Sequence, residues 1–142
     1  HDVRKRFAKN AMDSISGKTI AVIEDDAIVL EAYTQALTMR GASVIQIALD
    51  DEAFEEQMAV LEASAIDFII SDYRLKTCSG ADMIHKLREV FNDEIPAVIV
   101  TADTSPAHIQ YFSHLNIPVL HKPVSFQQVI SVVESKLSNV GA

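Results

Sequence analysis

Short apolar segments rich in valine and isoleucine recur along the chain from Thr19 onward and alternate with longer, partly polar segments. Within the short segments the apolar residues are consecutive rather than alternating with polar ones. This pattern is typical of strands buried on both faces of a parallel sheet. We therefore predict five strands, at residues 20–23, 44–47, 66–70, 97–100 and 118–120.

The longer segments place apolar residues three or four positions apart, which is the spacing of an amphipathic helix. The clearest stripes are Val29/Tyr33/Leu37, Phe54/Met58/Leu61, Ile84/Leu87/Phe91 and Phe126/Ile130/Val133/Leu137. A weaker helix is expected at 106–114. Strands and helices then alternate five times, which predicts an α/β fold, (βα)5, with an open parallel sheet covered by helices on both faces.

Helix-start signals support three of these helices. Ser79 with Asp82, and Ser125 with Gln128, have the spacing of a capping box, in which each side chain bonds to the other residue's backbone N–H. The Ser105-Pro106 dipeptide fits an N-cap followed by proline at the first helical position. These signals indicate where the later helices begin.

Polar side chains follow four of the predicted strands at the point where each strand ends. In open parallel sheets, ligands bind outside the carboxyl ends of the strands, so these side chains are expected to converge on one crevice. They are Glu24-Asp25-Asp26, Ser71-Asp72, Thr101-Ala102 and His121-Lys122-Pro123. A single aspartate at a strand end often only caps a helix. Four strands that all end in polar side chains at one edge of the sheet favour a functional site instead.

The residue types in this crevice suit phosphoryl chemistry. Crowded carboxylates repel one another unless a positive charge lies between them, and their oxygens are ligands that Mg²⁺ prefers. A carboxylate left free of a strong ion pair acts as a nucleophile toward phosphorus and forms an acyl phosphate. Lys122 and Thr101 would supply a charge and a hydrogen bond to the phosphoryl oxygens.

The same residues resemble the receiver domains of bacterial two-component response regulators, over residues 18–138. The resemblance rests on 22–26 (Val-Ile-Glu-Asp-Asp), on 70–72 (Ile-Ser-Asp) with Gly80 eight residues after Asp72, on 100–102 (Val-Thr-Ala), and on 122–123 (Lys-Pro). It implies a doubly wound, flavodoxin-like sheet of five parallel strands in the order 2-1-3-4-5.

The resemblance also implies which residues hold the phosphoryl group and the metal. Asp72 is the phosphoacceptor, and Asp25 is a direct Mg²⁺ ligand. Glu24 holds the ion through water, and the main-chain carbonyl of Arg74 is a further ligand. Successive strand side chains point to opposite faces, so not all three acidic residues can reach one ion; the resemblance selects Glu24 and Asp25, and Asp26 is expected mainly to cap the following helix.

The resemblance further implies that Thr101 and Lys122 act in the response to phosphorylation. The Thr101 hydroxyl moves toward the phosphoryl group, and Lys122 forms an ion pair with that group. The bond between Lys122 and Pro123 is expected to be cis, as it usually is in the family. The chain departs from the family at Lys76, where proline is frequent, and at Val119, where an aromatic residue often acts as a switch. The relay from threonine to an aromatic ring therefore looks incomplete.

The implied function is Mg²⁺-dependent transfer from a phosphohistidine-bearing kinase or phosphotransfer domain to Asp72, followed by conformational signalling and slow self-dephosphorylation. Residues 72–75 and 119–124 look most like receivers of hybrid sensor histidine kinases, whose parent chain is itself an enzyme. A free-standing response regulator and an unphosphorylated interaction scaffold stay open as alternatives, as does a homodimer. Arg74 and Asp103 are expected to pair across the mouth of the site.

A phosphatase of the haloacid-dehalogenase type, which also combines Asp, Thr, Lys and Mg²⁺, is excluded by the residues around the nucleophile. That family requires Asp-x-Asp, whereas the chain reads Asp72-Tyr73-Arg74, and it requires a late acidic pair where only Glu134 follows Asp103. The five histidines do not cluster at metal-ligand spacing and are interpreted as surface or packing residues.

The amino-acid composition limits the kinds of partner and of cellular compartment that suit this chain. The 142 residues carry 20 acidic and 12 basic side chains, a net charge of −8, which argues against nucleic-acid binding. A single cysteine favours a reducing compartment, and no apolar run approaches the ~20 residues of a membrane span. We expect a cytoplasmic domain at 18–142, with an open question whether the parent protein is membrane-anchored. Residues 1–17, which are rich in Lys and Arg, are expected to be a basic linker or a remnant of cloning.

Overall fold

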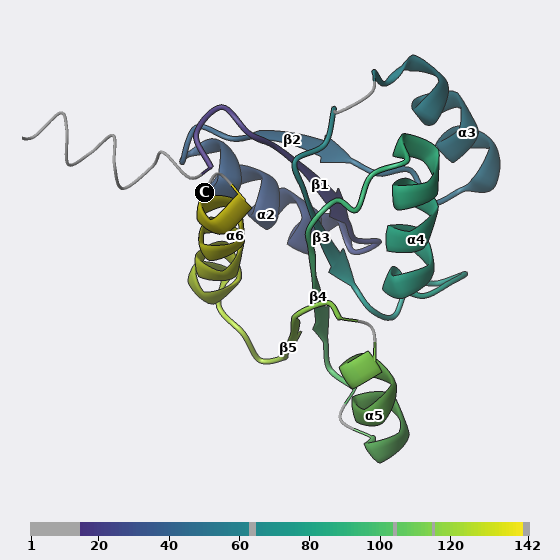
Figure 1. Ribbon diagram of the computed structural model, residues 1–142, viewed down its shortest axis with the longest axis vertical. Coiled ribbons are helices and arrows are strands. Elements are labelled where there is room, and N and C mark those ends of the chain that lie inside the picture. Colours follow the sequence, from purple (N-terminus) through teal and green to yellow (C-terminus); the bar gives the residue numbers. More distant parts are fainter. Residues whose placement is uncertain (1–14, 63–64, 104, 115, 141–142) are drawn as a thin grey trace, which may run out of the picture.

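The computed structural model describes residues 15–62, 65–103, 105–114 and 116–140. Within them, five parallel strands form one sheet in the order β2-β1-β3-β4-β5. The strands are β1 (Thr19–Ile23), β2 (Ser43–Gln46), β3 (Phe68–Asp72), β4 (Ala97–Thr101) and β5 (Val119–His121). The predicted doubly wound sheet and its strand order are confirmed (Figure 1).

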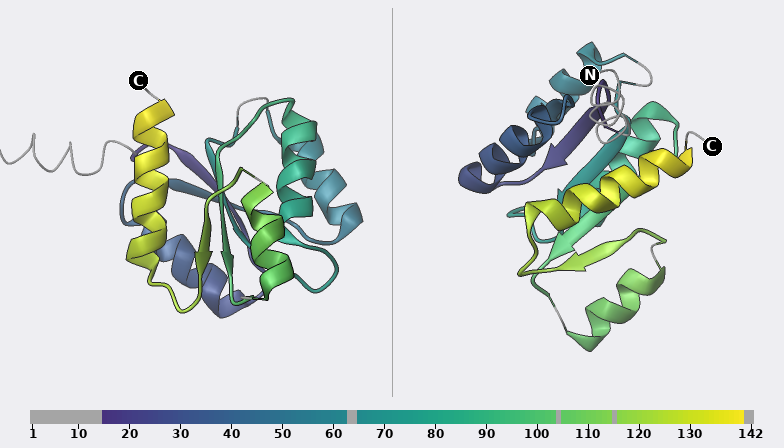
Figure 2. Two further views of the ribbon diagram at one scale, coloured as in Figure 1. Left: turned by 60° about the horizontal axis from the view of Figure 1, so that its bottom comes forward. Right: turned by 90° about the vertical axis from the view of Figure 1, so that its left-hand side faces the viewer.

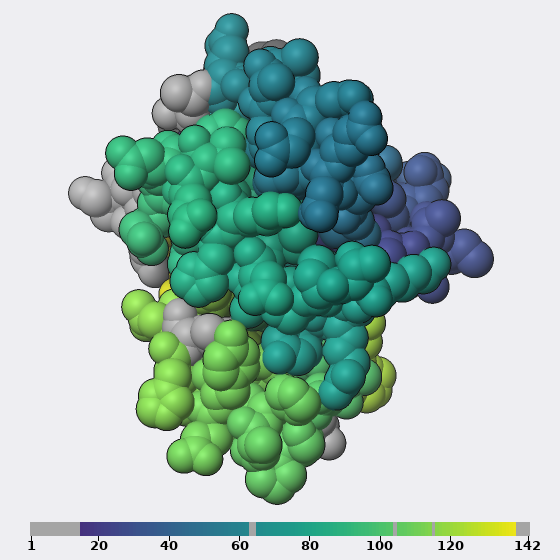
Figure 3. All heavy atoms as spheres, turned by 90° about the vertical axis from the view of Figure 1, so that its right-hand side faces the viewer, coloured from purple at the N-terminus to yellow at the C-terminus, as the bar shows by residue number. Residues whose placement is uncertain are grey.

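Helices follow the strands in alternation and cover both faces of the sheet. They are α2 (Ala27–Thr38), α3 (Asp51–Val60), α4 (Gly80–Phe91), α5 (Pro106–His114) and α6 (Phe126–Val140). Helices α2 and α6 lie on one face, and α3, α4 and α5 lie on the other (Figure 2). Figure 3 shows the outer surface of that second layer, from α3 to α5.

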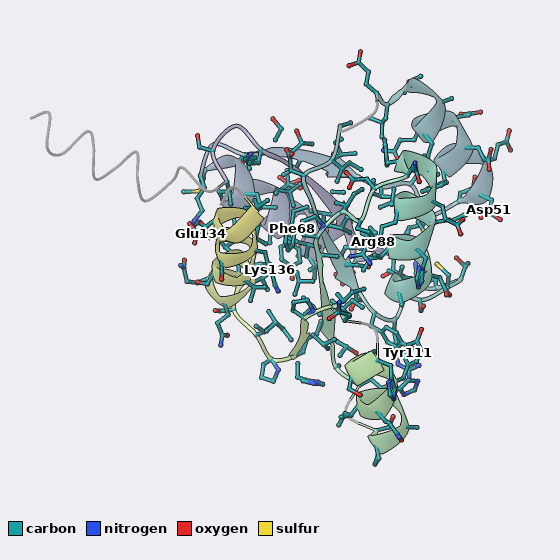
Figure 4. All side chains as sticks on the ribbon, viewed as in Figure 1. Asp51, Phe68, Arg88, Tyr111, Glu134 and Lys136 are labelled. Carbon is teal, nitrogen blue, oxygen red and sulfur yellow. The ribbon has the colours of Figure 1, made fainter. Side chains whose placement is uncertain are left out.

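The core consists of two hydrophobic layers, one on each face of the sheet. In β1, Ile20 and Val22 pack into the layer under α2 and α6, whereas Ala21 and Ile23 pack into the opposite layer. Strands β3 and β4 divide in the same way. Because both faces of these three strands are buried, their consecutive core positions are apolar, which is why β1, β3 and β4 appear as continuous runs. Phe68 lies in the middle of the molecule, while Asp51 lies at the outer edge of α3 (Figure 4).

Strand β3 is displaced from its predicted position at 66–70 to Phe68–Asp72. Ile66 is buried but precedes the strand, and the Asp67 carboxylate accepts the Thr19 N–H at 2.8 Å. At the other end the main-chain ladder continues through polar residues, pairing Asp72 with Val100 of β4. The phosphoacceptor candidate is therefore the last residue of the central strand.

Helices α4 and α6 begin where the capping signals in the sequence predict. Ser79 and Asp82 form a capping box at the start of α4. At the start of α6, the Gln128 side chain accepts the Ser125 N–H at 2.9 Å and the Ser125 hydroxyl accepts the Gln128 N–H at 3.1 Å. These bonds satisfy backbone donors that would otherwise lack partners at the helix ends.

The described end of the expected linker, residues 15–17, packs against the domain. Ile15 is fully buried and packs in the layer that also contains Tyr33 and Leu37. The Gly17 N–H donates to the Gly41 carbonyl at 2.9 Å, which ties this turn to the loop before β2. The rest of the expected linker, residues 1–14, lies outside the described residues.

Among the described helices, none is long and apolar enough to cross a membrane.

Candidate functional site

The carboxyl edge of the sheet brings together the side chains that the sequence placed there. One carboxylate oxygen from each of Glu24, Asp25 and Asp72 lies within 4.8 Å of the other two. Lys122, which directly follows β5, places its Nζ 3.3 Å from Oδ1 of Asp72. Neighbouring strands end at the same level, so residues far apart in the sequence form one acidic crevice with a cation at its side.

The three acidic residues after β1 divide into two roles. Asp26 is the N-cap of α2, and its Oδ1 accepts the N–H groups of Ile28 and Val29 at 2.9 and 3.2 Å, as expected. Glu24 Oε2 accepts the Asp26 N–H at 3.1 Å, and Asp25 Oδ2 accepts the Lys76 N–H at 2.9 Å. Asp25 thereby holds the loop after β3, where the sequence has Lys76 in place of proline.

The carboxylates of the crevice are partly removed from water. Burial is the main reason why the pKa of Glu24 lies above its usual value, and it raises the pKa of Asp72 in the same way. The Lys122 ammonium opposes this shift at Asp72 but does not cancel it. Partial burial and the repulsion between neighbouring carboxylates both disfavour the ionised form of each group. A bound divalent cation would offset this repulsion and stabilise the ionised carboxylates.

A close backbone approach explains the glycine eight residues after Asp72. The Gly80 N–H donates to the Tyr73 carbonyl at 2.7 Å, and a Cβ on Gly80 would overlap the main-chain carbonyl oxygen of Asp72 and crowd the Ser71 hydroxyl. A side chain at this position would push the end of β3 aside. Gly80 thus holds the loop against the strand that presents Asp72.

Thr101 and Lys122 are linked through the main chain. The Lys122 N–H donates to the Thr101 carbonyl at 2.7 Å, and the bond from Lys122 to Pro123 is cis, as the resemblance implied. The Thr101 side chain is buried at the end of β4, where its Oγ1 accepts the Asp103 N–H at 3.0 Å. The Thr101 hydroxyl therefore lies where the loop that leads to α5 begins.

Arg74, two residues after Asp72, and Asp103, two residues after Thr101, form the expected ion pair. Arg74 Nη2 is 2.5 Å from Asp103 Oδ2, with the arginine side chain exposed and the aspartate side chain 6% exposed. The Ser105 N–H donates to the other aspartate oxygen at 2.9 Å. This backbone hydrogen bond, followed by the Arg74 guanidinium, holds the pKa of Asp103 well below its usual range.

Sequence reasoning missed His108, which it interpreted as a surface or packing residue. Its Nδ1 lies 2.7 Å from Asp103 Oδ2, the oxygen that also accepts Arg74. The histidine is on α5, five positions after the aspartate, and no motif spacing marks the contact. The weak apolar periodicity of 106–114 gave no indication of which face of α5 would turn toward the site.

Comparisons with known proteins agree with this geometry. The sequence profile of the response regulator receiver domain matches residues 20–134. The phosphate regulon transcriptional regulatory protein PhoB of Pseudomonas aeruginosa is 31% identical over 87 residues, covering 61% of this chain and 36% of that protein. The probable transcriptional regulatory protein TcrX of Mycobacterium tuberculosis is 25% identical over 124 residues, covering 87% of this chain and 51% of that protein.

The chain therefore spans only about a third to a half of the length of these curated relatives. A solved structure with the same fold is a response regulator protein from Burkholderia pseudomallei, described with a phosphorylated aspartic acid, a calcium ion and citrate. It is 21% identical with a TM-score of 0.66, covering 87% of this chain and 71% of that one. At this identity the likeness supports the fold alone.

Proposed function

This chain belongs to the family of response regulator receiver domains, and we propose that it accepts a phosphoryl group from a phosphohistidine donor onto Asp72. The observation that carries the proposal is the acidic crevice of Glu24, Asp25 and Asp72, with Lys122 at 3.3 Å from the central carboxylate. In the transfer, an Asp72 carboxylate oxygen forms a bond to phosphorus as the bond from phosphorus to the donor's imidazole nitrogen breaks. The bonding electron pair returns to that nitrogen, and Asp72 becomes an acyl phosphate.

The residues present fit a bound Mg²⁺. Three carboxylate oxygens within 4.8 Å of one another form a hard, anionic ligand set, and the burial that raises the pKa values of Glu24 and Asp72 disfavours leaving them unneutralised. Glu24, Asp25 and Asp72, with the main-chain carbonyl of Arg74, would hold the ion. When bound, Mg²⁺ supplies positive charge that offsets the charge on the carboxylates and on the phosphoryl oxygens.

Thr101 and Lys122 complete the proposed site. The Lys122 ammonium, next to Asp72, is in reach of an oxygen of the phosphoryl group, and the Thr101 hydroxyl would donate a hydrogen bond to another. Because both residues precede loops that lead to outer helices, their movement toward the phosphoryl group would displace those loops. Val119 offers no ring to follow Thr101, so the signal would leave the site through these loops and α5.

Two parent proteins are compatible with this domain. The sequence motifs at 72–75 and 119–124 support a receiver within a hybrid sensor histidine kinase. The matches to PhoB and TcrX, both transcriptional regulatory proteins by name, support a free-standing response regulator instead. The gene sequence around this domain distinguishes the two, since a histidine-kinase catalytic domain before residue 1 occurs only in the first.

The proposed function predicts uptake of one phosphoryl group per chain from acetyl phosphate in the presence of Mg²⁺. Asp72 provides the nucleophile, so no partner protein is needed when a small phosphodonor replaces the phosphohistidine. Intact-protein mass spectrometry measures the uptake, and the same incubation with excess chelator should give none. A chain that stays unmodified under both conditions would be an interaction scaffold, contrary to the proposal.

The ion pair at the mouth of the site predicts a longer-lived phosphoryl group. By their resemblance to receiver domains, Arg74 and Asp103 occupy the positions that flank the path of the hydrolytic water, and their pairing would hinder its approach to the acyl phosphate. Arg74→Ala and Asp103→Ala are each expected to shorten the lifetime by up to about fivefold, because a partly exposed ion pair contributes only weakly to keeping the two side chains together. Decay of the label in Mg²⁺ buffer provides the measurement; an unchanged or slower decay in both variants contradicts the shielding role.

A further inference from the structure

Helix α5 contacts the loops on both sides of the phosphoacceptor strand. Tyr73, the residue after Asp72, packs edge-to-face against Phe112 with ring centroids 4.7 Å apart, and its ring also lies 5.7 Å from the ring of His108. On the other loop, Asp103 contacts His108 through its carboxylate. His108 therefore lies between the loop that follows β3 and the loop that follows β4.

The contact between His108 and Asp103 is a close polar contact between one ring nitrogen and one carboxylate oxygen. The Asp103 carboxylate is ionised, because the Ser105 N–H and the Arg74 guanidinium hold its pKa below the usual range. Nδ1 of His108 lies 2.7 Å from Oδ2 of this ionised carboxylate, close enough for a charge-dipole or ion-pair attraction between the ring and the aspartate. The same nitrogen is hydrogen-bonded to the Ser105 hydroxyl at 2.7 Å, so Ser105 and Asp103 both lie at this edge of the ring.

Oδ1 of Asp103 is held by the Ser105 N–H, whereas Oδ2 is the oxygen that meets Arg74 and His108. The arginine side chain is 69% exposed, and an exposed ion pair contributes little to fixing the position of either partner. His108 is better placed to do so, because it belongs to a helix turn and its ring packs against Tyr73 and Phe112. The aspartate oxygen that binds Arg74 is thus fixed from the helix side.

We propose that His108 is a positioning residue, which holds Asp103 so that Arg74 stays across the mouth of the site and the phosphoryl group on Asp72 is shielded from hydrolysis. This inference rests on the proposed function of Asp72. In hydrolysis, a water oxygen forms a bond to phosphorus as the bond from phosphorus to the Asp72 oxygen breaks. Asp72 is released as a carboxylate, one water proton stays on the phosphate, and the other passes to solvent.

The position of α5 then becomes coupled to the lifetime of the phosphoryl group. Movement of the helix away from the loops would withdraw Nδ1 from Asp103 and release the guanidinium of Arg74. Because such coupling is reciprocal, a phosphorylation state that displaces the Asp103 loop would also displace α5. His108 would in this way substitute for the aromatic relay that Val119 interrupts.

The test compares side chains that keep or remove a polar nitrogen at the position of Nδ1. His108→Asn retains an N–H donor close to the position of Nδ1, His108→Gln moves the amide further along the side chain, and His108→Leu retains bulk without a donor. His114→Leu, on the exposed last turn of the same helix, is the matched control. Each full-length variant is loaded with acetyl phosphate and Mg²⁺, the phosphodonor is removed, and loss of the label is followed by mass spectrometry.

We expect His108→Leu and His108→Gln to lose the phosphoryl group up to about fivefold faster than the wild type, as Asp103→Ala does. His108→Asn and His114→Leu should decay at the wild-type rate. The double variant His108→Leu with Asp103→Ala should decay no faster than Asp103→Ala alone, because both changes break the same contact. A residue with a merely structural role would not be rescued by asparagine, nor would its effect disappear when Asp103 is absent.

Wild-type decay in His108→Leu, failure of asparagine to rescue, or additive effects in the double variant would each overturn the role of His108 and leave the proposed function intact. Absence of any label in the wild type would instead overturn both, since no acyl phosphate would exist to be shielded. The two failures are therefore distinguishable in one experiment.

Discussion

Asp72→Asn is expected to take up no phosphoryl group from acetyl phosphate, whatever the Mg²⁺ concentration, while the domain folds normally. The side-chain amide has nearly the shape of the carboxylate but lacks a nucleophilic oxygen with a negative charge. Uptake is measured by intact mass, and Asp93→Asn, which changes an exposed aspartate after α4, is the matched control. Labelling of Asp72→Asn to the wild-type level would show that another residue is the acceptor.

The same variant is expected to be at least as stable as the wild type at neutral pH without metal. Burial raises the pKa of Asp72 in the folded chain, so its ionisation disfavours folding, and the contribution of Asp72 to stability is lost as the pH rises through that pKa. Asparagine removes this cost, although it also removes the ion pair with Lys122, whose effect on the pKa is smaller than that of burial. Thermal unfolding at neutral pH, with chelator present, provides the comparison and confirms that loss of label is not loss of fold.

Asp25→Asn is expected to weaken Mg²⁺ binding by at least about tenfold, whereas Asp26→Asn leaves it nearly unchanged. Asp25 contributes an oxygen to the acidic crevice, while Asp26 is engaged with two backbone N–H groups of α2. Asparagine keeps a hydrogen-bond acceptor at both positions, for the Lys76 N–H in one case and for the helix cap in the other. The two variants therefore differ in which charge is removed and not in which hydrogen bond is lost.

Mg²⁺ titrations followed by calorimetry or by amide chemical shifts measure this difference. Equal losses of affinity in the two variants would contradict the division between metal ligand and helix cap. A loss of affinity in Asp26→Asn alone would mean that Asp26, and not Asp25, binds the cation. The proposed ligand set would then be wrong.

Much of the fold was predictable because two-sided burial leaves a clear pattern in the sequence. Ile20 and Val22 serve one hydrophobic layer and Ala21 and Ile23 the other, so the strand cannot include a polar position within this run. The end of β3 was less predictable, because a strand continues as long as its main chain is paired. Ser71 and Asp72 are polar yet belong to the ladder, and hydrophobicity alone therefore placed the strand two residues too early.

The acidic crevice was predictable for a different reason. Parallel strands joined by helices all end at one edge of the sheet, so residues that follow the strands meet regardless of their separation in the sequence. Glu24 and Asp72 are 48 positions apart, yet each offers an oxygen to the same small cluster. Nothing beyond the order of the strands was needed to bring them together.

The contact made by His108 was not predictable in this way. It depends on how α5 is rotated about its axis, and that rotation is set by packing of the Tyr73 and Phe112 rings. The burial of Ile15 was missed for a similar reason, since a single apolar residue before a strand gives no periodic signal. Contacts that depend on the docking of one helix or one turn leave no repeating pattern in the sequence.

The most direct test of the account is to locate the phosphoryl group chemically. Borohydride reduces an acyl phosphate on aspartate to homoserine, and peptide mass spectrometry then identifies the reduced position after labelling with acetyl phosphate and Mg²⁺. We predict homoserine at position 72 and an unmodified carboxylate at positions 24, 25, 26 and 103. Homoserine at any of those other positions, or none at position 72 in a labelled chain, would contradict the assignment of Asp72 as the phosphoacceptor.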